Sequence, residues 1–277
     1  MFKKFIFALA LALSSSASFA APPFSECRQF FSKGQIPVIP HETELNARAL
    51  CYSSFAILHS AKSHTPIYVA EKLNRQTIID AKGNERTNRF FADARLPRAE
   101  RAELSDYKNS GYDRGHMAPA GNMATPEAMA QSFSLANMVP QAPENNRKTW
   151  ASIENATRKY AMRARGDVYV LTGPVFEARP TTIGENKVWV PKYLFKLVYD
   201  PSENKRWAYW VENIDNTKAG KPITYEELVK RTGIQFFTES NVSTKIKQPV
   251  QLNERAVCEL LYELIYKVIG QLGHQLN

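Results

Sequence analysis

Apolar and aromatic residues gather in short runs that are separated by polar stretches. The runs with strand character are residues 50–59, 66–73, 167–175, 188–199 and 206–211. The polar stretch 60–65 lies between the first two runs and predicts a β-hairpin, with His59 and His64 as surface histidines at its turn. Glu203 and Asn204 mark a second turn, between the last two runs.

Helical spacing and capping residues predict the helices. They cover residues 126–135, 225–232 and 254–272, with a short helix near 26–32 inside an irregular arm (21–48). A further long helix is capped by Asn145 or Asn146 and runs to about residue 165. Thr125 and Thr224 are helix caps, Pro126 suits a first helical position, and Gly233 suits a helix end. Residues 74–112 and 137–143 show no period and predict loops. These elements predict an α+β fold, with a mostly antiparallel central sheet flanked by helices.

The first 20 residues predict a secretory signal peptide. Lys3 and Lys4 precede a short apolar run, and small residues allow cleavage after Ala20. An uncleaved membrane tether is the alternative, although the apolar run is too short to span a bilayer. The expected mature protein is a secreted or periplasmic single domain, residues 21–277, without a membrane anchor.

Composition is typical of a folded protein with a basic surface. Hydrophobic residues make up 44% of the 277 residues, which excludes a disordered chain. The formal net charge is +9, or +7 without Lys3 and Lys4 (9 − 2). Basic residues suit a polyanion such as nucleic acid, and equally a membrane surface or a cell wall.

The three cysteines, Cys27, Cys51 and Cys258, allow one disulfide. We favour Cys27–Cys51, because it would tie the N-terminal arm to the first strand. A bond from Cys258 to either of the others stays open. No Cys-x-x-Cys or Cys/His cluster is present, which argues against a zinc site.

Residues 113–122, Asp-Arg-Gly-His-Met-Ala-Pro-Ala-Gly-Asn, hold the strongest candidate chemistry. His116 can take a proton from water near neutral pH. Pro119 and Gly121 break regular structure, so His116 is expected at the end of an element, beside a loop. A histidine of this kind is, by itself, more often a surface or structural residue than a catalyst.

The surroundings of His116 resemble the DNA/RNA non-specific endonucleases, which are related to endonuclease G and belong to the ββα-metal (His-Me finger) superfamily. The matching segments are Ser105-Asp106-Tyr107, Ser110-Gly111-Tyr112, Asp113 to Ala120, Asn137 to Gln141, Asn146, Trp150, Glu154 and Thr172-Gly173-Pro174. The resemblance runs from about residue 50 to 235. It implies a ββα-metal finger at the edge of the sheet, and a nuclease that is often a homodimer.

The resemblance also implies roles for individual residues. They are His116 as general base, Asn146 as metal ligand, Glu154 as a ligand through water, Asn137 as a supporting residue and Arg114 as a phosphate contact. An upstream arginine should face the scissile phosphate: Arg89 fits best, and Arg86 competes with it. Asn146, Trp150 and Glu154 are four residues apart, so they share a helix face, with Trp150 expected in the core. Mg²⁺ needs few protein oxygens, which suits this set, and Mn²⁺ could replace it.

The predicted function is an exported, metal-dependent endonuclease that cuts DNA and RNA without sequence specificity. The alternative is a catalytically inactive exported nucleic-acid-binding protein, which the basic charge would serve equally well. The joint presence of His116, Asn137, Asn146 and Glu154 favours the enzyme, because a binding protein needs no general base.

Overall fold

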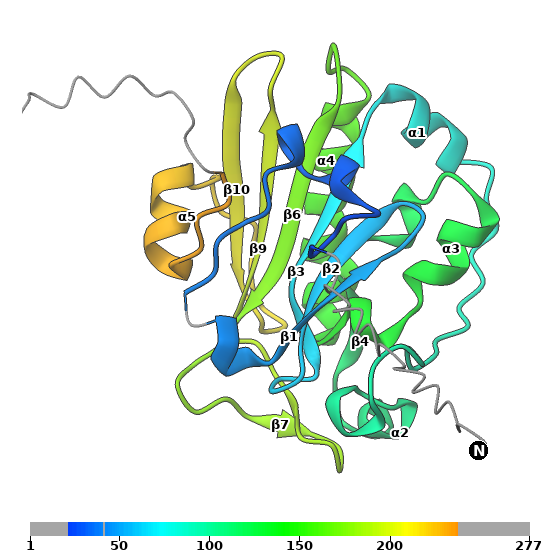
Figure 1. The fold of residues 1–277 in the computed structure, drawn as a ribbon, viewed down its shortest axis with the longest axis vertical. Coiled ribbons are helices and arrows are strands. Elements are labelled where there is room, and N and C mark those ends of the chain that lie inside the picture. The colour runs from blue at the N-terminus through cyan, green and yellow to red at the C-terminus, as the bar shows by residue number, and fades with distance from the viewer. Residues whose placement is uncertain (1–21, 41, 238–277) are drawn as a thin grey trace, which may run out of the picture. The chain divides into compact units, whose positions relative to one another are not determined.

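The computed structural model describes residues 22–40 and 42–237, and its centre is a six-stranded sheet (Figure 1). In spatial order the strands are β1 (Ala47–Cys51), β2 (Phe55–Ser60), β3 (Thr65–Leu73), β6 (Val168–Val175), β9 (Tyr193–Asp200) and β10 (Lys205–Glu212). Every neighbouring pair is antiparallel, which confirms the predicted sheet. The predicted signal (1–20), the predicted C-terminal helix (254–272) and Cys258 lie outside the described residues.

Three sequence predictions for the strands of this sheet and their residues need correction. Residues 50–59 are not one strand, because a turn separates Cys51 of β1 from Phe55 of β2. Residues 188–199 are also divided, into β8 (Val188–Trp189), which pairs with β7 (Thr182–Ile183), and β9. Pro191 lies at this break, where it has no N–H to offer a ladder. His59 is not at the surface: it is buried in β2, with Nε2 2.8 Å from the carbonyl oxygen of Glu100.

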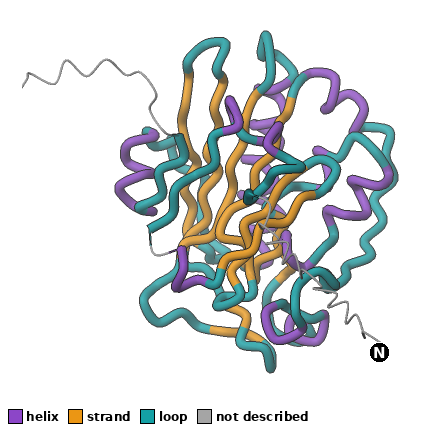
Figure 2. Tube along the Cα trace, viewed as in Figure 1, coloured by secondary structure: helices purple, strands orange, loops and turns teal. Residues whose placement is uncertain are grey.

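Five α-helices lie around the sheet in the part of the chain that the structure describes. They are α1 (Arg75–Ala81), α2 (Leu104–Tyr107), α3 (Pro126–Ser132), α4 (Ala151–Ala161) and α5 (Tyr225–Thr232). Shorter 3₁₀ segments cover Arg28–Phe30, Ser32–Gly34, Glu42–Leu45, Arg98–Glu100, Ala120–Asn122 and Leu135–Asn137, and a π-helical segment covers Asn145–Trp150. In the described residues, the strands of the large sheet lie side by side, with helices on either side of them in this view (Figure 2).

Capping explains which helices the sequence predicted well. The Thr125 and Thr224 hydroxyls accept hydrogen bonds from Ala128 N and Glu227 N, as expected for caps. Gly233 ends α5 with a φ of 71°. Helix α1 was missed inside the polar stretch 74–112, although a capping box joins Asn74 to Thr77 at its start. The helix expected near 26–32 is a pair of 3₁₀ turns.

Both faces of the sheet are buried. Odd-numbered residues of β2 (Phe55, Ile57) pack with the segments around His116, and even-numbered ones (Ala56, Leu58) pack with the N-terminal arm and α5. The Cys27–Cys51 disulfide joins that arm to β1, with a Cα–Cα distance of 5.6 Å. This confirms the favoured pairing and leaves neither cysteine for Cys258.

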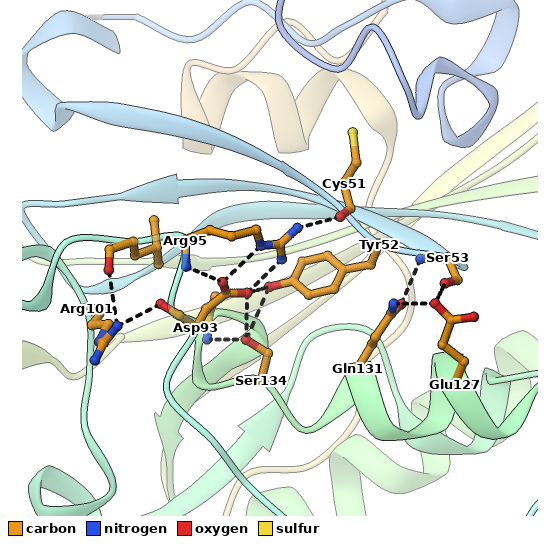
Figure 3. Close-up of polar contacts among 11 residues, drawn as sticks. Cys51, Tyr52, Ser53, Asp93, Arg95, Arg101, Glu127, Gln131 and Ser134 are labelled. Atoms are coloured by element: carbon orange, nitrogen blue, oxygen red, sulfur yellow. Dashed lines mark hydrogen bonds and ion pairs between the residues drawn. The ribbon is translucent and has the colours of Figure 1, made fainter.

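A buried polar network fixes the long segment between α1 and α2 (Figure 3). The Tyr52 hydroxyl donates to Asp93 Oδ2 at 2.6 Å, and Arg95 donates to the same oxygen at 2.7 Å. Burial alone would raise the pKa of Asp93, but the hydrogen bonds from Arg95 and Tyr52 lower it to about 2. The Tyr52 oxygen is also hydrogen-bonded to the hydroxyl of Ser134 at 3.1 Å, and Ser134 is next to Phe133. The network therefore holds the segment against the Phe133 region, which forms one wall of the candidate site.

No helix within residues 22–40 and 42–237 is both long and apolar enough to cross a membrane.

Candidate active site

Two short strands and a helix form the frame of the site. Strand β4 (Asp113–His116) pairs with β5 (Met138–Gln141) in antiparallel register, so that His116 lies opposite Met138. The π-helical segment Asn145–Trp150 follows and continues into α4. This is the ββα arrangement that was expected, with His116 at the end of its strand. Residues 138–141, predicted as loop, are a strand instead.

Gly115 is required for the pairing of β4 with β5. A Cβ atom at this position would lie 2.1 Å from Gln141 Oε1 and 2.6 Å from Gln141 Cβ, closer than atoms can approach. Gln141 is buried, so it has little room to move. The glycine therefore lets the strand carrying His116 lie against its partner.

Gly115→Ala is expected to destabilise the fold by about 1–3 kcal/mol, the usual cost of overpacking, and to displace His116. Gly83→Ala is the matched control, because a Cβ there meets nothing within 4 Å. Denaturant unfolding of both variants measures the difference. Equal stabilities would show that the close contact with Gln141 is not a constraint.

His116 is held in an apolar environment. Its ring packs edge-on against Phe133 at 5.0 Å and is tilted against Phe90 at 5.8 Å, and it is 7% exposed. Nε2 has no hydrogen-bond partner among the described residues. Burial lowers the pKa of His116 to about 3, and the positive charges of Arg86 and Arg114 act in the same direction. The imidazole is therefore neutral at physiological pH, the form that accepts a proton.

The lowered histidine pKa values predict a loss of stability in acid. Burial also lowers the pKa of His59, to about 4. Below the ordinary histidine pKa of 6.5, the unfolded chain binds protons that the folded chain does not. The free energy of unfolding therefore decreases as the pH is lowered from 6.5 to the pKa values of the folded protein. Each such histidine contributes a slope of about 1.4 kcal/mol per pH unit.

His59→Gln is therefore expected to lose less stability than the wild type between about pH 6.5 and pH 4. The measurement is the free energy of unfolding across that range. Parallel curves for the two proteins would contradict the assignment of a neutral, buried His59.

Asn137 supports the segment that follows His116. Its Oδ1 accepts from Ala118 N, and its Nδ2 donates to the carbonyl oxygens of Ala118 and Ser132, each at 2.9 Å. The side chain is fully buried. Because both ends of the amide are bound to backbone, Asn137 can position the chain after His116 but cannot reach a substrate.

Asp113 orients the amide of Asn146. Asn146 Nδ2 donates to Asp113 Oδ2 at 2.9 Å, and Arg147 binds the same carboxylate with a contact of 2.7 Å. Burial alone would raise the pKa of Asp113, but the bonds from Arg147 and Asn146 hold it below its ordinary value. The ionised Asp113 carboxylate thus accepts a hydrogen bond from Nδ2 of the Asn146 amide. The other amide atom, Oδ1, is therefore the Asn146 atom that can bind a cation.

Trp150 is a packing residue, as predicted. It is buried, and its Nε1 donates to the His116 carbonyl oxygen at 3.3 Å. This bond joins the helical element that carries Asn146 directly to the end of β4.

Two adjoining cavities open beside Arg114 and Asn146. The first has a volume of about 420 Å³ and is lined by Arg86, Arg114, His116, Pro119, Ala120, Gly121, Asn146, Arg147, Ala151, Glu154 and Arg158. The second has a volume of about 570 Å³ and shares Arg86, Arg114 and Asn146 with the first. We call the first the catalytic cavity and the second the side cavity. His116, Arg114, Asn146 and Glu154 are thus brought together by the fold.

Arg86, not Arg89, is the upstream arginine at the catalytic cavity. The Arg86 guanidinium lies 5.1 Å from the centre of the Phe133 ring, and Arg89 lines neither cavity. The Arg114 guanidinium lies 4.1 Å from the Phe90 ring centre. Among the described residues, no carboxylate is within ion-pair distance of Arg86 or Arg114, so both can bind an anion. The sequence favoured Arg89 because two phenylalanines follow it.

Two positive charges that were not predicted act on Glu154: the buried Lys196 and the half-buried Arg158. Burial raises the pKa of Glu154, and the charges of Lys196 and Arg158 oppose that rise. Lys196 is buried in β9, where its Nζ donates to Thr172 Oγ1 at 2.7 Å. A lysine within an apolar strand and an arginine four residues after Glu154 were the sequence signals for this group.

The oxygen atoms at the catalytic cavity suit one hard divalent cation. No three His, Cys, Asp or Glu side chains among the described residues gather into a metal-binding group. Mg²⁺ needs few protein ligands because it keeps several waters. The amide oxygen of Asn146 as direct ligand, with the Glu154 carboxylate acting through water, fits that requirement.

Comparison with known proteins agrees with the geometry. A family model described as DNA/RNA non-specific endonuclease matches residues 34–243. Nuclease C1 of Cunninghamella echinulata is 32% identical over 212 residues, covering 69% of this chain and 83% of that protein. Nuclease EXOG, mitochondrial, of Xenopus laevis is 28% identical over 302 residues, covering 98% of this chain and 82% of that protein. A crystal structure of an EndoG/EndoGI complex has a TM-score of 0.67 at 25% identity, covering 80% of this chain and 95% of that chain.

These relatives contradict the predicted secreted or periplasmic location. Several of them, including the one from Xenopus laevis, are named as mitochondrial nucleases. The first 20 residues contain two lysines, four serines and no acidic residue. Mitochondrial targeting segments are also rich in serine and poor in acidic residues, but they are rich in arginine, which these 20 residues lack. The location is therefore corrected by the relatives and not by the residues of this segment.

Proposed function

This chain belongs to the DNA/RNA non-specific endonuclease family, and we propose from that premise that it hydrolyses phosphodiester bonds with Mg²⁺ and with His116 as general base. The observation that carries the proposal is the catalytic cavity, where a neutral, buried histidine, two arginines and an oriented amide oxygen meet. A nucleic-acid-binding protein without activity would need the arginines, but it would need neither the histidine nor the amide.

Each residue has a defined task in this proposal. His116, kept neutral by its apolar walls, accepts the proton of the attacking water. Arg86 and Arg114 bind the non-bridging phosphate oxygens and oppose the negative charge that grows on them. Asn146 and Glu154 would hold a divalent cation, which supplies Lewis acidity to the phosphate and stabilises the leaving oxygen.

The supporting residues explain why these groups stay in place. Asn137 fixes the chain after His116, and Asp113 fixes the amide of Asn146. Trp150 ties the two elements together through the His116 carbonyl. Positioning of this kind lowers the barrier because the groups need not reorganise when the substrate binds.

Breadth of substrate follows from what the catalytic cavity offers. Its lining presents arginines and amide groups, which bind phosphate, and phosphate carries no sequence information. Cleavage of both DNA and RNA is therefore part of the proposal. The homodimer implied by the family resemblance stays a prediction, which the mass of the protein in solution tests.

Digestion of supercoiled plasmid and of ribosomal RNA, each with Mg²⁺ and with excess EDTA, tests this function. We expect both substrates to be degraded in Mg²⁺ and preserved in EDTA. A salt-dependent gel shift without products in Mg²⁺ would instead support the inactive binding protein. Degradation that continues in EDTA would contradict the metal requirement.

A further inference from the structure

Three neighbouring strands of the large sheet bring polar side chains together in a buried place. Strands β3, β6 and β9 lie side by side, and Lys196 of β9 is directly opposite Thr172 of β6 (Figure 1). Thr172 is also opposite Val69, so Glu71, two residues further along β3, lies on the same face of the sheet. That face packs against the segments around His116. Glu71, Thr172 and Lys196 are each at most 1% exposed, so none of them can reach a substrate.

Lys196 connects the sheet to both parts of the site. Its Nζ donates to Thr172 Oγ1 at 2.7 Å and to the carbonyl oxygen of Met117 at 3.4 Å. The same nitrogen lies 5.1 Å from the centre of the Trp150 ring. Met117 directly follows β4, and Trp150 ends the π-helical segment. One side chain of the sheet therefore contacts both the strand end that carries the proposed general base and the helical element that carries the proposed metal ligand.

The backbone of segment 116–118 has a hydrogen-bond partner for each polar group from its first carbonyl to its last. Trp150 binds the first carbonyl, and Asn137 binds the last carbonyl and the two N–H groups between them. The remaining group is the carbonyl of Met117, which accepts from Lys196. Without that donor a buried carbonyl would lose its bond to the sheet, and the segment would be free to shift.

Glu71 balances the buried charge of Lys196. Burial lowers the pKa of Lys196, and the charges of Glu71 and Glu154 oppose that fall. Burial raises the pKa of Glu71 to about 7, and the charge of Lys196 opposes that rise. Glu71 Oε1 accepts from Asn122 Nδ2 at 2.9 Å, whereas Oε2 has no hydrogen-bond partner among the described residues. Removal of Lys196 alone would therefore leave a buried carboxylate without its opposing charge, which destabilises a fold whatever the reaction needs.

We propose that Lys196 is a positioning residue of this nuclease, which fixes His116 relative to the helical element that carries Asn146. It does so by holding the Met117 carbonyl and the Trp150 ring against the sheet. The inference rests on the proposed nuclease function and adds a residue that acts without touching the substrate. Displacement of a catalytic group by about 1 Å can slow a reaction by roughly 10²-fold, so a support of this kind affects the rate.

The test compares the wild type with a double variant, Lys196→Met with Glu71→Gln, which removes both buried charges. Neutral replacements of a buried ion pair are often as stable as the pair, so the denaturant midpoint should stay near that of the wild type. Initial rates of plasmid cleavage in Mg²⁺ should show a kcat that is lower by roughly 10- to 100-fold, with KM within about twofold. Amide hydrogen exchange of segment 116–118 should be roughly tenfold faster, because the segment has lost its bond to the sheet.

Lys72→Met is the matched control, because it is the same substitution at a partly exposed lysine of β3. Lys72 lies 3.4 Å from Asp167 at the surface and lines neither cavity, so its loss should leave kcat and the exchange of segment 116–118 unchanged. A double variant with the wild-type kcat would overturn the inference, because Lys196 would then serve stability alone. A lower kcat without faster exchange would overturn it as well.

Thr172→Val decides the matter if the double variant does not fold. It keeps both buried charges and nearly the same side-chain shape, and it removes the oxygen that binds Lys196 Nζ. We then expect kcat to fall by about threefold, the usual effect of one hydrogen bond, with KM unchanged. A wild-type kcat in that variant would overturn the inference. Failure of the wild type to cut plasmid would count against the proposed function itself, while hydrogen exchange would still show whether Lys196 fixes the segment.

Discussion

His116→Ala is expected to lower kcat for DNA cleavage by about 10²- to 10⁴-fold, the usual contribution of a general base. The ring sits at the end of β4, walled by Phe90 and Phe133, and it is neutral because burial lowers its pKa. Alanine removes the proton acceptor but leaves the arginines and the amide of Asn146 in place. Substrate affinity should therefore change much less than kcat, and initial rates across DNA concentration separate the two.

The matched control for this variant is His64→Asn. His64 has a positive φ of 57°, which asparagine tolerates, and it lines neither the catalytic nor the side cavity. Its activity should equal that of the wild type. Imidazole added at high concentration should restore part of the activity of His116→Ala, because it can fill the space of the missing ring. If His116→Ala cuts at the wild-type rate, the general base lies elsewhere.

Asn146→Ala is expected to lower cleavage by roughly 10³-fold at a fixed Mg²⁺ concentration, since Lewis-acid stabilisation is worth several kcal/mol. The amide oxygen is the proposed direct protein ligand, and the bond from Nδ2 to Asp113 holds it in place. Loss of that ligand should also raise the Mg²⁺ concentration needed for half-maximal activity. Rates measured across a Mg²⁺ titration show both effects.

Lys148→Ala, in the same π-helical segment, is the control for Asn146→Ala. The Lys148 side chain is 73% exposed and pairs with Glu144 at the surface, so its loss should leave the Mg²⁺ titration unchanged. A normal Mg²⁺ titration for Asn146→Ala would show that the cation is bound by other residues.

Local signals explain what could be predicted from the sequence. The 225–232 helix was predicted with its limits because Thr224 and Gly233 specify a start and an end within a few residues. The central antiparallel sheet was predicted, though from five runs rather than six strands, because its strands are rich in apolar and aromatic residues. Such elements are specified by the residues within them and next to them, and not by contacts with distant parts of the chain.

The short strands of the site carry no such signal. Strand β5 has four residues and includes Pro140, so it is specified by its pairing with β4 rather than by its own pattern. The choice between Arg86 and Arg89 likewise depends on how the segment after α1 folds against Phe133, which the network around Asp93 decides. His59 could not be placed because burial of one polar side chain depends on long-range packing against Glu100.

The most direct test of the account is cleavage of supercoiled plasmid by the wild type and by a His116→Ala, Asn146→Ala double variant, with binding measured in parallel. The wild type should cut in Mg²⁺ and not in excess EDTA. The double variant should bind the plasmid but cut it no faster than the slower single variant, because both residues serve one step. Metal-dependent cutting by the double variant at a rate near that of the wild type would contradict a single site built on β4, β5 and the helical segment after them.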